Sequence, residues 1–282
     1  MIKLVLSDVD GTLVPFGHSH ASERTYAAIR ALKASGIRFG LSTGRDSVEL
    51  AAQFEGQEDL FDTGILSNGK KILVDGRLVR LTLLDNDGIQ RMVKLIEEYP
   101  QSFVTAYPLH TKPGNPIYCM GASEDEVEPW AQRFGFTPII SPEVPDIEVI
   151  GATIACPHEE QVMLEIIERG REICSGFDFV RPSRDWTDIL PKGLNKGSAL
   201  GLLLEELGAT PDEVVVCGDA DNDLSILSQV TNSVAVANAM PAVKEATRWH
   251  IGAAEDDAMA DLLERMAKKG MEGLREAAVQ TS

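Results

Sequence analysis

Short apolar runs alternate with segments of helical periodicity over residues 1–83, and they do so again after about residue 190. Runs such as Ile2–Leu6 and Val214–Cys217 are typical of strands buried on both faces, which occur mainly in parallel sheets. Strands of this kind alternating with helices favour an α/β fold, in which helices cover a parallel sheet. We therefore predict that the two stretches form one α/β domain.

Apolar periodicity and end signals place the other elements of this domain. Asp75-Gly76 is typical of a two-residue hairpin turn between two short strands. The residues from Met271 on are expected to be loosely held. The further expected strands are Ile37–Leu41, Gly64–Ser67, Lys71–Val74, Leu78–Leu81 and Ser233–Val236, and the expected helices are Ser22–Ser35, Ser47–Phe54, Lys196–Leu207, Asn222–Leu227 and Asp257–Lys269.

Between these stretches the pattern changes to longer amphipathic helices and β-rich runs, with frequent prolines. Ser123 and Glu126 form a plausible capping box at the start of one such helix. We expect an α+β domain over residues 84–187, inserted into a core domain made of residues 1–83 and 188–282. Its expected helices are Asp87–Glu98, Glu124–Phe134 and Glu159–Cys174, and its expected strands are Phe103–Tyr107, Ile117–Met120, Val149–Cys156 and Phe177–Arg181.

The chain is strongly acidic: 26 Lys and Arg against 44 Asp and Glu give 282 residues a net charge of −18. Such a field repels nucleic acid and anionic membrane surfaces, so neither is an expected partner. No apolar segment approaches the ~18 residues that a membrane helix needs. The four cysteines form no C-x-x-C pair and are expected to be buried, reduced thiols. We therefore expect a cytoplasmic protein.

Acidic residues follow two of the expected strands. Asp8-Val9-Asp10-Gly11-Thr12 comes after the first strand, and Gly218-Asp219-Ala220-Asp221-Asn222-Asp223 comes after Val214–Cys217. Ligand sites in open α/β sheets form at the carboxyl ends of strands, and oxygen-rich loops there suit Mg²⁺. The second run lacks the glycine and glutamate of an EF-hand, and neither run has His or Cys for zinc. An Asp-rich turn without chemistry is the alternative for either run, but a second such run disfavours it.

Two further segments supply groups that bind phosphate. Thr43 and Gly44, in Ser42-Thr43-Gly44-Arg45, follow the strand Ile37–Leu41 and offer a hydroxyl and turn amides. Lys196 begins a helix behind Asn195, where its ammonium and the helix N-terminus both attract an anion. Each segment alone is a weak signal, but together with the two acidic runs they make a coherent set.

These four elements resemble the four motifs of the haloacid dehalogenase (HAD) superfamily of phosphatases. Asp8-Val9-Asp10-Gly11-Thr12 is similar to the first, Thr43 to the second, Lys196-Gly197 to the third, and Gly218-Asp219 with Asn222-Asp223 to the fourth. The insertion resembles the large C2-type cap of the Cof-type branch. Ser67-Asn68-Gly69, before the insertion, and Ala237-Asn238-Ala239, after the fourth motif, are also similar to that branch. The resemblance implies a Rossmann-like parallel-sheet core with an inserted α+β cap.

The resemblance also implies a role for each residue. Asp8 would be the nucleophile that forms an aspartyl-phosphate, and Asp10 would protonate the leaving oxygen and then activate water. Mg²⁺ would be held by Asp8, the Asp10 carbonyl and Asp219. The phosphoryl oxygens would be bound by Thr43 and Lys196; the supporting residues would be Gly11, Thr12, Gly44, Asn222 and Asp223, and Arg184 is a candidate for substrate specificity.

Three classes of function compete for this chain. The leading one is a Mg²⁺-dependent phosphatase of a small phosphorylated metabolite, such as a sugar phosphate. A phosphomannomutase-like isomerase would use the same aspartyl-phosphate but would need cations for a second phosphate. Residues 84–187 hold 8 Lys and Arg against 18 Asp and Glu, a net of −10, which disfavours that class. A catalytically silent binding protein would require the loss of a reacting group, and none is missing. Nothing in the sequence indicates an oligomeric state.

Overall fold

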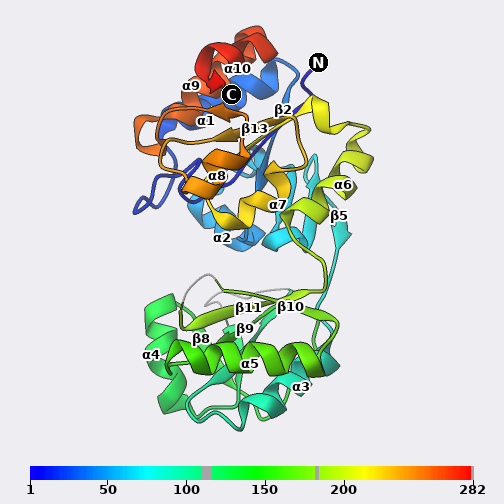
Figure 1. Cartoon of the computed structure of the whole chain (residues 1–282), viewed down its shortest axis with the longest axis vertical. Helices are drawn as coiled ribbons and strands as arrows, with labels where there is room; N and C mark the ends of the chain where they lie inside the picture. The colour runs from blue at the N-terminus through cyan, green and yellow to red at the C-terminus, as the bar shows by residue number, and fades with distance from the viewer. Residues whose placement is uncertain (110–115, 182–183, 281–282) are drawn as a thin grey trace. The chain divides into compact units, whose positions relative to one another are not determined.

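The computed structural model describes residues 1–109, 116–181 and 184–280. The chain divides into two compact units, shown in Figure 1. Met1–Leu81 with Asn195–Ser282 is called the core unit here, and Thr82–Leu194 the cap unit. The chain returns to the core unit at Asn195, later than the expected residue 188, because an additional cap strand, Trp186–Pro191, precedes the return.

The core unit is an α/β structure built on one nine-stranded sheet in the order β15-β14-β13-β12-β1-β2-β3-β4-β5. Its strands are β1 (Leu4–Ser7), β2 (Arg38–Ser42), β3 (Gly64–Leu66), β4 (Lys71–Val74), β5 (Arg77–Leu81), β12 (Val214–Gly218), β13 (Asn232–Ala235), β14 (Trp249–His250) and β15 (Val279–Gln280). Its helices are α1 (Glu23–Ala34), α2 (Ser47–Gln53), α6 (Lys196–Leu207), α7 (Leu224–Leu227), α8 (Pro241–Ala246), α9 (Ala258–Lys269) and α10 (Met271–Ala277).

The centre of this sheet is parallel, as the apolar runs predict. β1 pairs in parallel with β12 on one side and with β2 on the other, and Leu4 lies opposite Val214. Every residue of β1 and β12 is buried, because helices cover both faces of the sheet. The expected Asp75-Gly76 turn joins β4 to β5 with both residues at positive φ, 49° and 76°.

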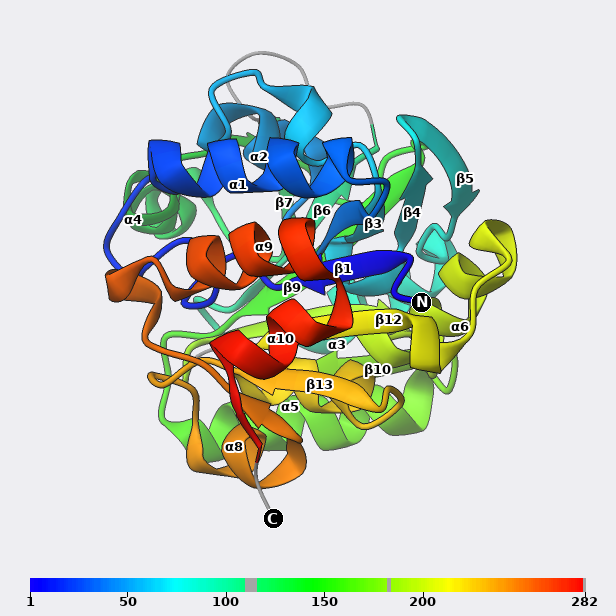
Figure 2. The same ribbon diagram turned by 90° about the horizontal axis from the view of Figure 1, so that it is seen from above.

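The C-terminal segment is more ordered than expected. α9 packs between α1 and α10, and the three helices lie together in Figure 2. Leu274 of α10 is fully buried, and β15 pairs antiparallel with β14 at the edge of the sheet. The expectation that the chain is loosely held from Met271 on is therefore wrong for the residues up to 280, because Leu274 is buried against the core and β15 is hydrogen-bonded to β14. The last two residues lie outside the described part.

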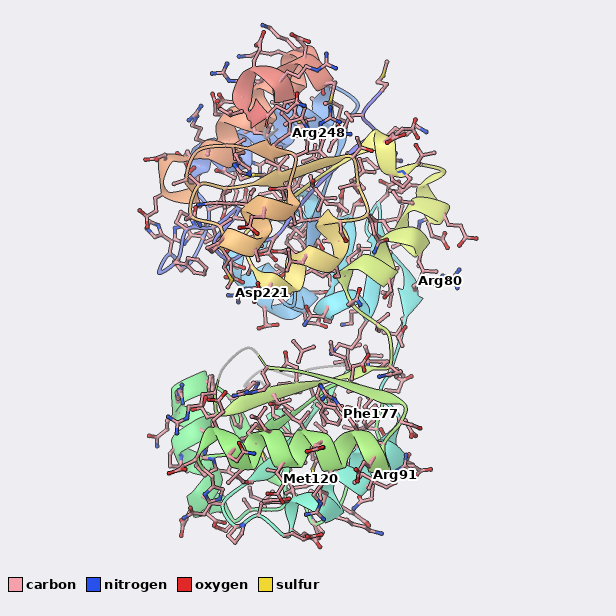
Figure 3. The ribbon with its side chains drawn as sticks, viewed as in Figure 1. Arg80, Arg91, Met120, Phe177, Asp221 and Arg248 are labelled. Carbon is pink, nitrogen blue, oxygen red and sulfur yellow. The ribbon has the colours of Figure 1, made fainter. Side chains whose placement is uncertain are left out.

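The cap unit is an antiparallel-rich sheet of six strands with three helices, in the order β10-β11-β9-β6-β7-β8. Two of its strands, β8 and β11, were not predicted from the sequence. Met120 and Phe177, labelled in Figure 3, belong to its apolar core. Its elements are α3 (Asn86–Ile96), β6 (Phe103–Pro108), β7 (Pro116–Met120), α4 (Glu124–Phe134), β8 (Thr137–Ile140), β9 (Val149–Ala155), α5 (Glu160–Ile173), β10 (Phe177–Val180) and β11 (Trp186–Pro191).

Several local expectations are confirmed in both units. The Ser123 backbone N–H and hydroxyl both donate to Glu126, which is the expected capping box of α4. The Asn195 side chain accepts from the Ser198 backbone N–H and so caps α6. All four cysteines are free and buried. Within the described residues, no helix is long and apolar enough to cross a membrane.

Candidate active site

The two acidic runs meet because β1 and β12 are parallel neighbours. Ser7 lies opposite Cys217, so the segments that follow β1 and β12 leave the sheet at the same edge. The Asp8 backbone N–H donates to the Cys217 carbonyl at 2.9 Å, which extends the pairing by one residue. Asp8 and Asp219 therefore emerge side by side at the carboxyl ends of the central strands, where the sequence places a ligand site.

A buried lysine bridges these two runs. Lys196 is 1% exposed, and its Nζ donates to Asp8 Oδ1 at 2.6 Å and to Asp223 Oδ1 at 2.7 Å. The backbone of α6 approaches α7 closely enough that a Cβ on Gly197 would lie 2.2 Å from the Ser225 carbonyl oxygen. A glycine at this position therefore lets the helix bring Lys196 to the two carboxylates.

Asp223 folds back over the loop that carries it. Its Oδ2 accepts hydrogen bonds from the backbone N–H groups of Asp219 at 3.1 Å and Ala220 at 3.2 Å. A Cβ on Gly218 would lie 2.7 Å from the Asp223 carboxyl carbon, so the glycine is required for this close approach. Asn222, by contrast, is exposed and makes no side-chain hydrogen bond in the part of the chain that the structure describes. Asp221 is also exposed (Figure 3).

The turn after β1 is tied to the second acidic run. Thr12 Oγ1 donates to Asp219 Oδ1 at 2.7 Å, and both residues are buried. Gly11 has φ +84°, and a Cβ there would lie 2.6 Å from Asp219 Oδ2. Asn238 Nδ2 donates to the Gly11 carbonyl at 2.7 Å. This contact gives Asn238 a place in the site that its position in the sequence did not predict.

Three buried carboxylates could together hold a metal ion. One oxygen from each of Asp8, Asp219 and Asp223 lies within 4.8 Å of the others. Lys196 donates to Asp8 and Asp223, whereas the side-chain donor to Asp219 is the neutral Thr12 hydroxyl. Three carboxylates and one ammonium leave an excess of negative charge, and an all-oxygen donor set suits a hard divalent cation. The residues therefore fit the metal that the sequence predicts.

The pKa values of these groups express the same imbalance. Burial raises the pKa of Asp8 well above its usual range, against the ammonium of Lys196, which lowers it. Burial likewise raises the pKa of Asp219 to about 6, although the Thr12 hydroxyl opposes this. Burial lowers the pKa of Lys196, but the carboxylates of Asp8 and Asp223 more than offset that effect and raise it. The two carboxylates, Asp8 and Asp219, are thus ionised at a cost that a further cation would relieve, whereas the Lys196 ammonium is already stabilised by its partners.

Thr43 and Gly44 lie at the same edge, because β2 is the parallel neighbour of β1 on the other side. Thr43 is buried, and its Oγ1 accepts from the Arg45 backbone N–H at 3.1 Å. A Cβ on Gly44 would lie 3.2 Å from the amide nitrogen of Asn68, so the glycine leaves room for that side chain. The hydroxyl proton of Thr43 is therefore available for another acceptor.

Asp10 and Arg184 differ from the other expected residues. The side chain of Asp10 is not in the buried carboxylate cluster but pairs with Arg45, which the sequence analysis left without a role. Arg184 is exposed and lies in the cap unit just before β11, where its carbonyl accepts from Arg181 at 3.4 Å. No motif signal distinguishes Arg45 from the many arginines that follow a Thr-Gly turn.

A family model described as haloacid dehalogenase-like hydrolase matches residues 5–263. The chain belongs to this hydrolase family. The expected α/β core with an inserted cap is confirmed as the fold class, and the resemblance drawn from the motifs is confirmed by the match. The family membership also confirms that the chain is an enzyme of the hydrolase class.

Proteins of similar sequence or structure align with most of the length of this hydrolase. The 5-amino-6-(5-phospho-D-ribitylamino)uracil phosphatase YbjI of Escherichia coli (strain K12) is 24% identical over 270 residues, which are 95% of this chain and 97% of the relative. The HMP-PP phosphatase of Serratia proteamaculans (strain 568) is 28% identical over 251 residues, 86% of this chain and 87% of the relative. A solved haloacid dehalogenase-like hydrolase from Bacteroides thetaiotaomicron has a TM-score of 0.78 at 23% identity, covering 94% of this chain and 100% of that one.

Proposed function

We propose that this hydrolase is a Mg²⁺-dependent phosphatase that cleaves the monoester of a small phosphorylated metabolite through an aspartyl-phosphate on Asp8. The observation that carries the proposal is the buried Asp8 carboxylate at the end of β1, with the Lys196 ammonium 2.6 Å from its Oδ1. Asp8 Oδ2 accepts no hydrogen bond from the described residues, so one oxygen of the carboxylate is oriented while the other can attack. A nucleophile needs this combination of fixed orientation and free lone pairs.

The reaction then has two balanced steps. In the first, an Asp8 oxygen attacks phosphorus, the bond from phosphorus to the leaving oxygen breaks, and that oxygen takes a proton from Asp10. In the second, a water oxygen attacks the same phosphorus, the bond to Asp8 breaks, and the water proton passes to Asp10. Asp8 leaves as a carboxylate, so the enzyme returns to its starting state.

Thr43 and Lys196 are proposed to bind the transferring phosphoryl oxygens. Lys196 uses two of its three N–H bonds for Asp8 and Asp223, and the third meets no acceptor among the described residues. The Thr43 hydroxyl accepts from the Arg45 amide and keeps its proton to donate. Both donors are held before substrate arrives, which is how charge on a transferring phosphoryl group is stabilised.

Mg²⁺, held by Asp8, Asp219 and the Asp10 carbonyl, would neutralise charge on the phosphoryl group during transfer. Asp223 is proposed to orient this set, since it fixes Lys196 and the Asp219 backbone N–H at the same time. Thr12 holds Asp219 by its hydroxyl, and Gly11 permits the turn. Asn222 is exposed, which fits a contact with bound water rather than with these carboxylates.

A small metabolite is the proposed substrate class, and nucleic acids and membranes are not proposed partners. The net charge of −18 disfavours polyanions, and two of the relatives are named as phosphatases of small phosphorylated compounds. Arg184 is kept as a candidate for contact with the leaving group. The four free cysteines fit a reducing compartment, so the cytoplasm is the proposed location.

The proposal is tested by phosphate release from p-nitrophenyl phosphate and from a panel of phosphorylated metabolites, with and without Mg²⁺. We expect turnover that disappears in EDTA and in Asp8→Asn, and that persists in the matched control Asp75→Asn, whose carboxylate pairs with Arg38 on the surface. Activity that survives in Asp8→Asn would exclude the aspartyl-phosphate. Turnover of a sugar monophosphate only with a bisphosphate activator, and without free phosphate, would instead identify the mutase.

A further inference from the structure

Asp10 is held by a two-pronged ion pair from the next strand end. Arg45 Nε donates to Asp10 Oδ2 at 2.7 Å, and Arg45 Nη2 donates to Asp10 Oδ1 at 2.8 Å. This parallel arrangement of two hydrogen bonds fixes the plane and the rotamer of a carboxylate, which a single bond does not. Both side chains are partly exposed, 45% for Asp10 and 35% for Arg45, so the pair lies at the open side of the site.

The loop that carries Arg45 is itself held from behind. The Arg45 carbonyl accepts from the Ser67 backbone N–H at 3.0 Å. The neighbouring Asp46 accepts from the Ser67 hydroxyl at 2.9 Å and pairs with the buried Lys71 ammonium at 2.6 Å. Ser67 and Asn68 have backbone φ angles of 52° and 56°, in the left-handed region that residues other than glycine adopt uncommonly. A backbone kept in this conformation by several contacts is the kind of support that a precisely placed functional group requires.

We propose that Arg45 is a positioning residue for Asp10, and that it places the Asp10 carboxylate for the second half-reaction. In that step water attacks the phosphorus carried by Asp8, the bond to Asp8 breaks, and the water proton goes to Asp10. This inference rests on the proposed function. It goes beyond it by giving Arg45 a task that is separate from the binding of phosphate by Thr43 and Lys196.

Hydrogen-bond chemistry points to the second step rather than the first. Both Asp10 oxygens accept from a guanidinium, which has donors only, so the pair orients the side chain through its two acceptor oxygens. A general base accepts a proton at an oriented oxygen of this kind, whereas a general acid must present an O–H group, for which Arg45 offers no acceptor. Loss of Arg45 therefore frees the side chain to adopt other rotamers in the state that must accept the water proton, and the hydrolysis of the aspartyl-phosphate slows.

p-Nitrophenyl phosphate separates the two steps, because its phenolate leaves without needing a proton. Formation of the aspartyl-phosphate then depends little on Asp10, and its hydrolysis depends on it fully. The variants are Arg45→Met, which removes the hydrogen-bond donors to Asp10, and Arg45→Lys, which keeps the positive charge but cannot form the two parallel hydrogen bonds. Arg24→Met is the matched control, because Arg24 makes the same two-pronged pair with Glu264, at 2.9 Å for both bonds, on the surface of the core unit.

The experiment measures nitrophenolate release by stopped flow and in the steady state with Mg²⁺, together with the thermal midpoint of each variant. For Arg45→Met we expect kcat to fall about 10- to 100-fold while kcat/KM stays within about 3-fold of the wild type, so that KM falls with kcat. A pre-steady-state burst approaching one nitrophenolate per enzyme should accompany this. Arg45→Lys should keep part of the lost kcat, and Arg24→Met should match the wild type.

Two results would overturn the inference. A parallel fall of kcat and kcat/KM without a burst, in both Arg45 variants, would mean that Arg45 acts on the first step or on folding alone. A raised KM with kcat retained would mean that Arg45 binds the substrate phosphate instead of positioning Asp10. Failure of the proposed function is distinguishable from both, because the wild type would then show no Mg²⁺-dependent turnover of p-nitrophenyl phosphate at all.

Discussion

Replacing Asp8 with asparagine should abolish turnover and yet stabilise the metal-free protein. Burial holds the Asp8 carboxylate near two other buried carboxylates, and its pKa rises from the usual 3.8 to about 7. Below about pH 4, Asp8 is neutral in both the folded and the unfolded chain. Between about pH 4 and pH 7 the folded chain holds a proton that the unfolded chain has released, so the free energy of unfolding falls as the pH rises. Above about pH 7 the full cost of the buried charge is present.

The size of the effect follows from the same pKa. Each step of one in pKa corresponds to ~1.4 kcal/mol, so a rise of about 3 places an upper limit near ~4 kcal/mol on the cost of ionised Asp8. The asparagine side chain would keep a neutral oxygen for Lys196 but would lose the charge on that hydrogen bond. We therefore expect Asp8→Asn to raise the metal-free stability by about 1–3 kcal/mol at pH 8, which is about 3–10 °C in thermal midpoint for a unit of this size.

The assay is thermal unfolding of wild type and Asp8→Asn in EDTA from pH 4 to pH 8. The two midpoints should coincide near pH 4, diverge as the pH rises, and reach a constant difference above pH 7, with the variant more stable. Added Mg²⁺ should stabilise the wild type more than the variant, because Asp8 is one of the carboxylates proposed to bind it in the folded protein. A variant that is less stable than the wild type at pH 8, or a difference that does not change with pH, would refute the argument that Asp8 is held against an electrostatic cost.

Three further tests address other parts of the molecule. Lys196→Met leaves two buried carboxylates without their cation and should cost about 3–5 kcal/mol of metal-free stability, measured by thermal unfolding in EDTA; an unchanged midpoint would contradict the bridge. Thr12→Val removes the hydroxyl that donates to Asp219 and should lower stability by about 1–3 kcal/mol and weaken Mg²⁺ binding in a calorimetric titration. The four buried cysteines should react slowly with a thiol reagent in the native protein and fully in denaturant, since burial raises the pKa of Cys119 to about 12 and that of Cys217 further; a fast native thiol would contradict their burial.

The parallel core and the candidate site residues at its edge follow largely from patterns that are local in sequence. β1 and β12 are continuous apolar runs, which are typical of strands buried on both faces of a sheet, and the structure pairs them in parallel. Once they are parallel neighbours, Asp8 and Asp219 must emerge at one edge, so their proximity needs no further information. The capping signals of Asn195 and Ser123 are equally local, and both helices begin where those signals predict.

Elements that depend on tertiary packing escaped the sequence analysis. β8 is short and mostly exposed, so its four residues have no alternating pattern to mark them as a strand. α10 holds little apolar surface beyond Leu274, and it is defined by its packing on α9 rather than by its own periodicity. Arg45 lies 35 residues from Asp10 in sequence, and no local sequence pattern predicts that the two side chains pair. A side chain that completes a site from another strand becomes visible only when the sheet is assembled.

The acidic groups near the site affect ligand binding more than the net charge of the whole chain does. The net charge of −18 is screened over a Debye length of ~8 Å in physiological salt, so an incoming phosphate responds mainly to nearby charges. Four carboxylates, Asp8, Asp10, Asp219 and Asp223, are matched there by two cations, Lys196 and Arg45. Charges 4.8 Å apart interact with about 3 kcal/mol at an effective dielectric of 20. Two uncompensated negative charges would therefore repel a phosphate dianion strongly, so under the proposed function we expect a divalent cation to bind before the substrate.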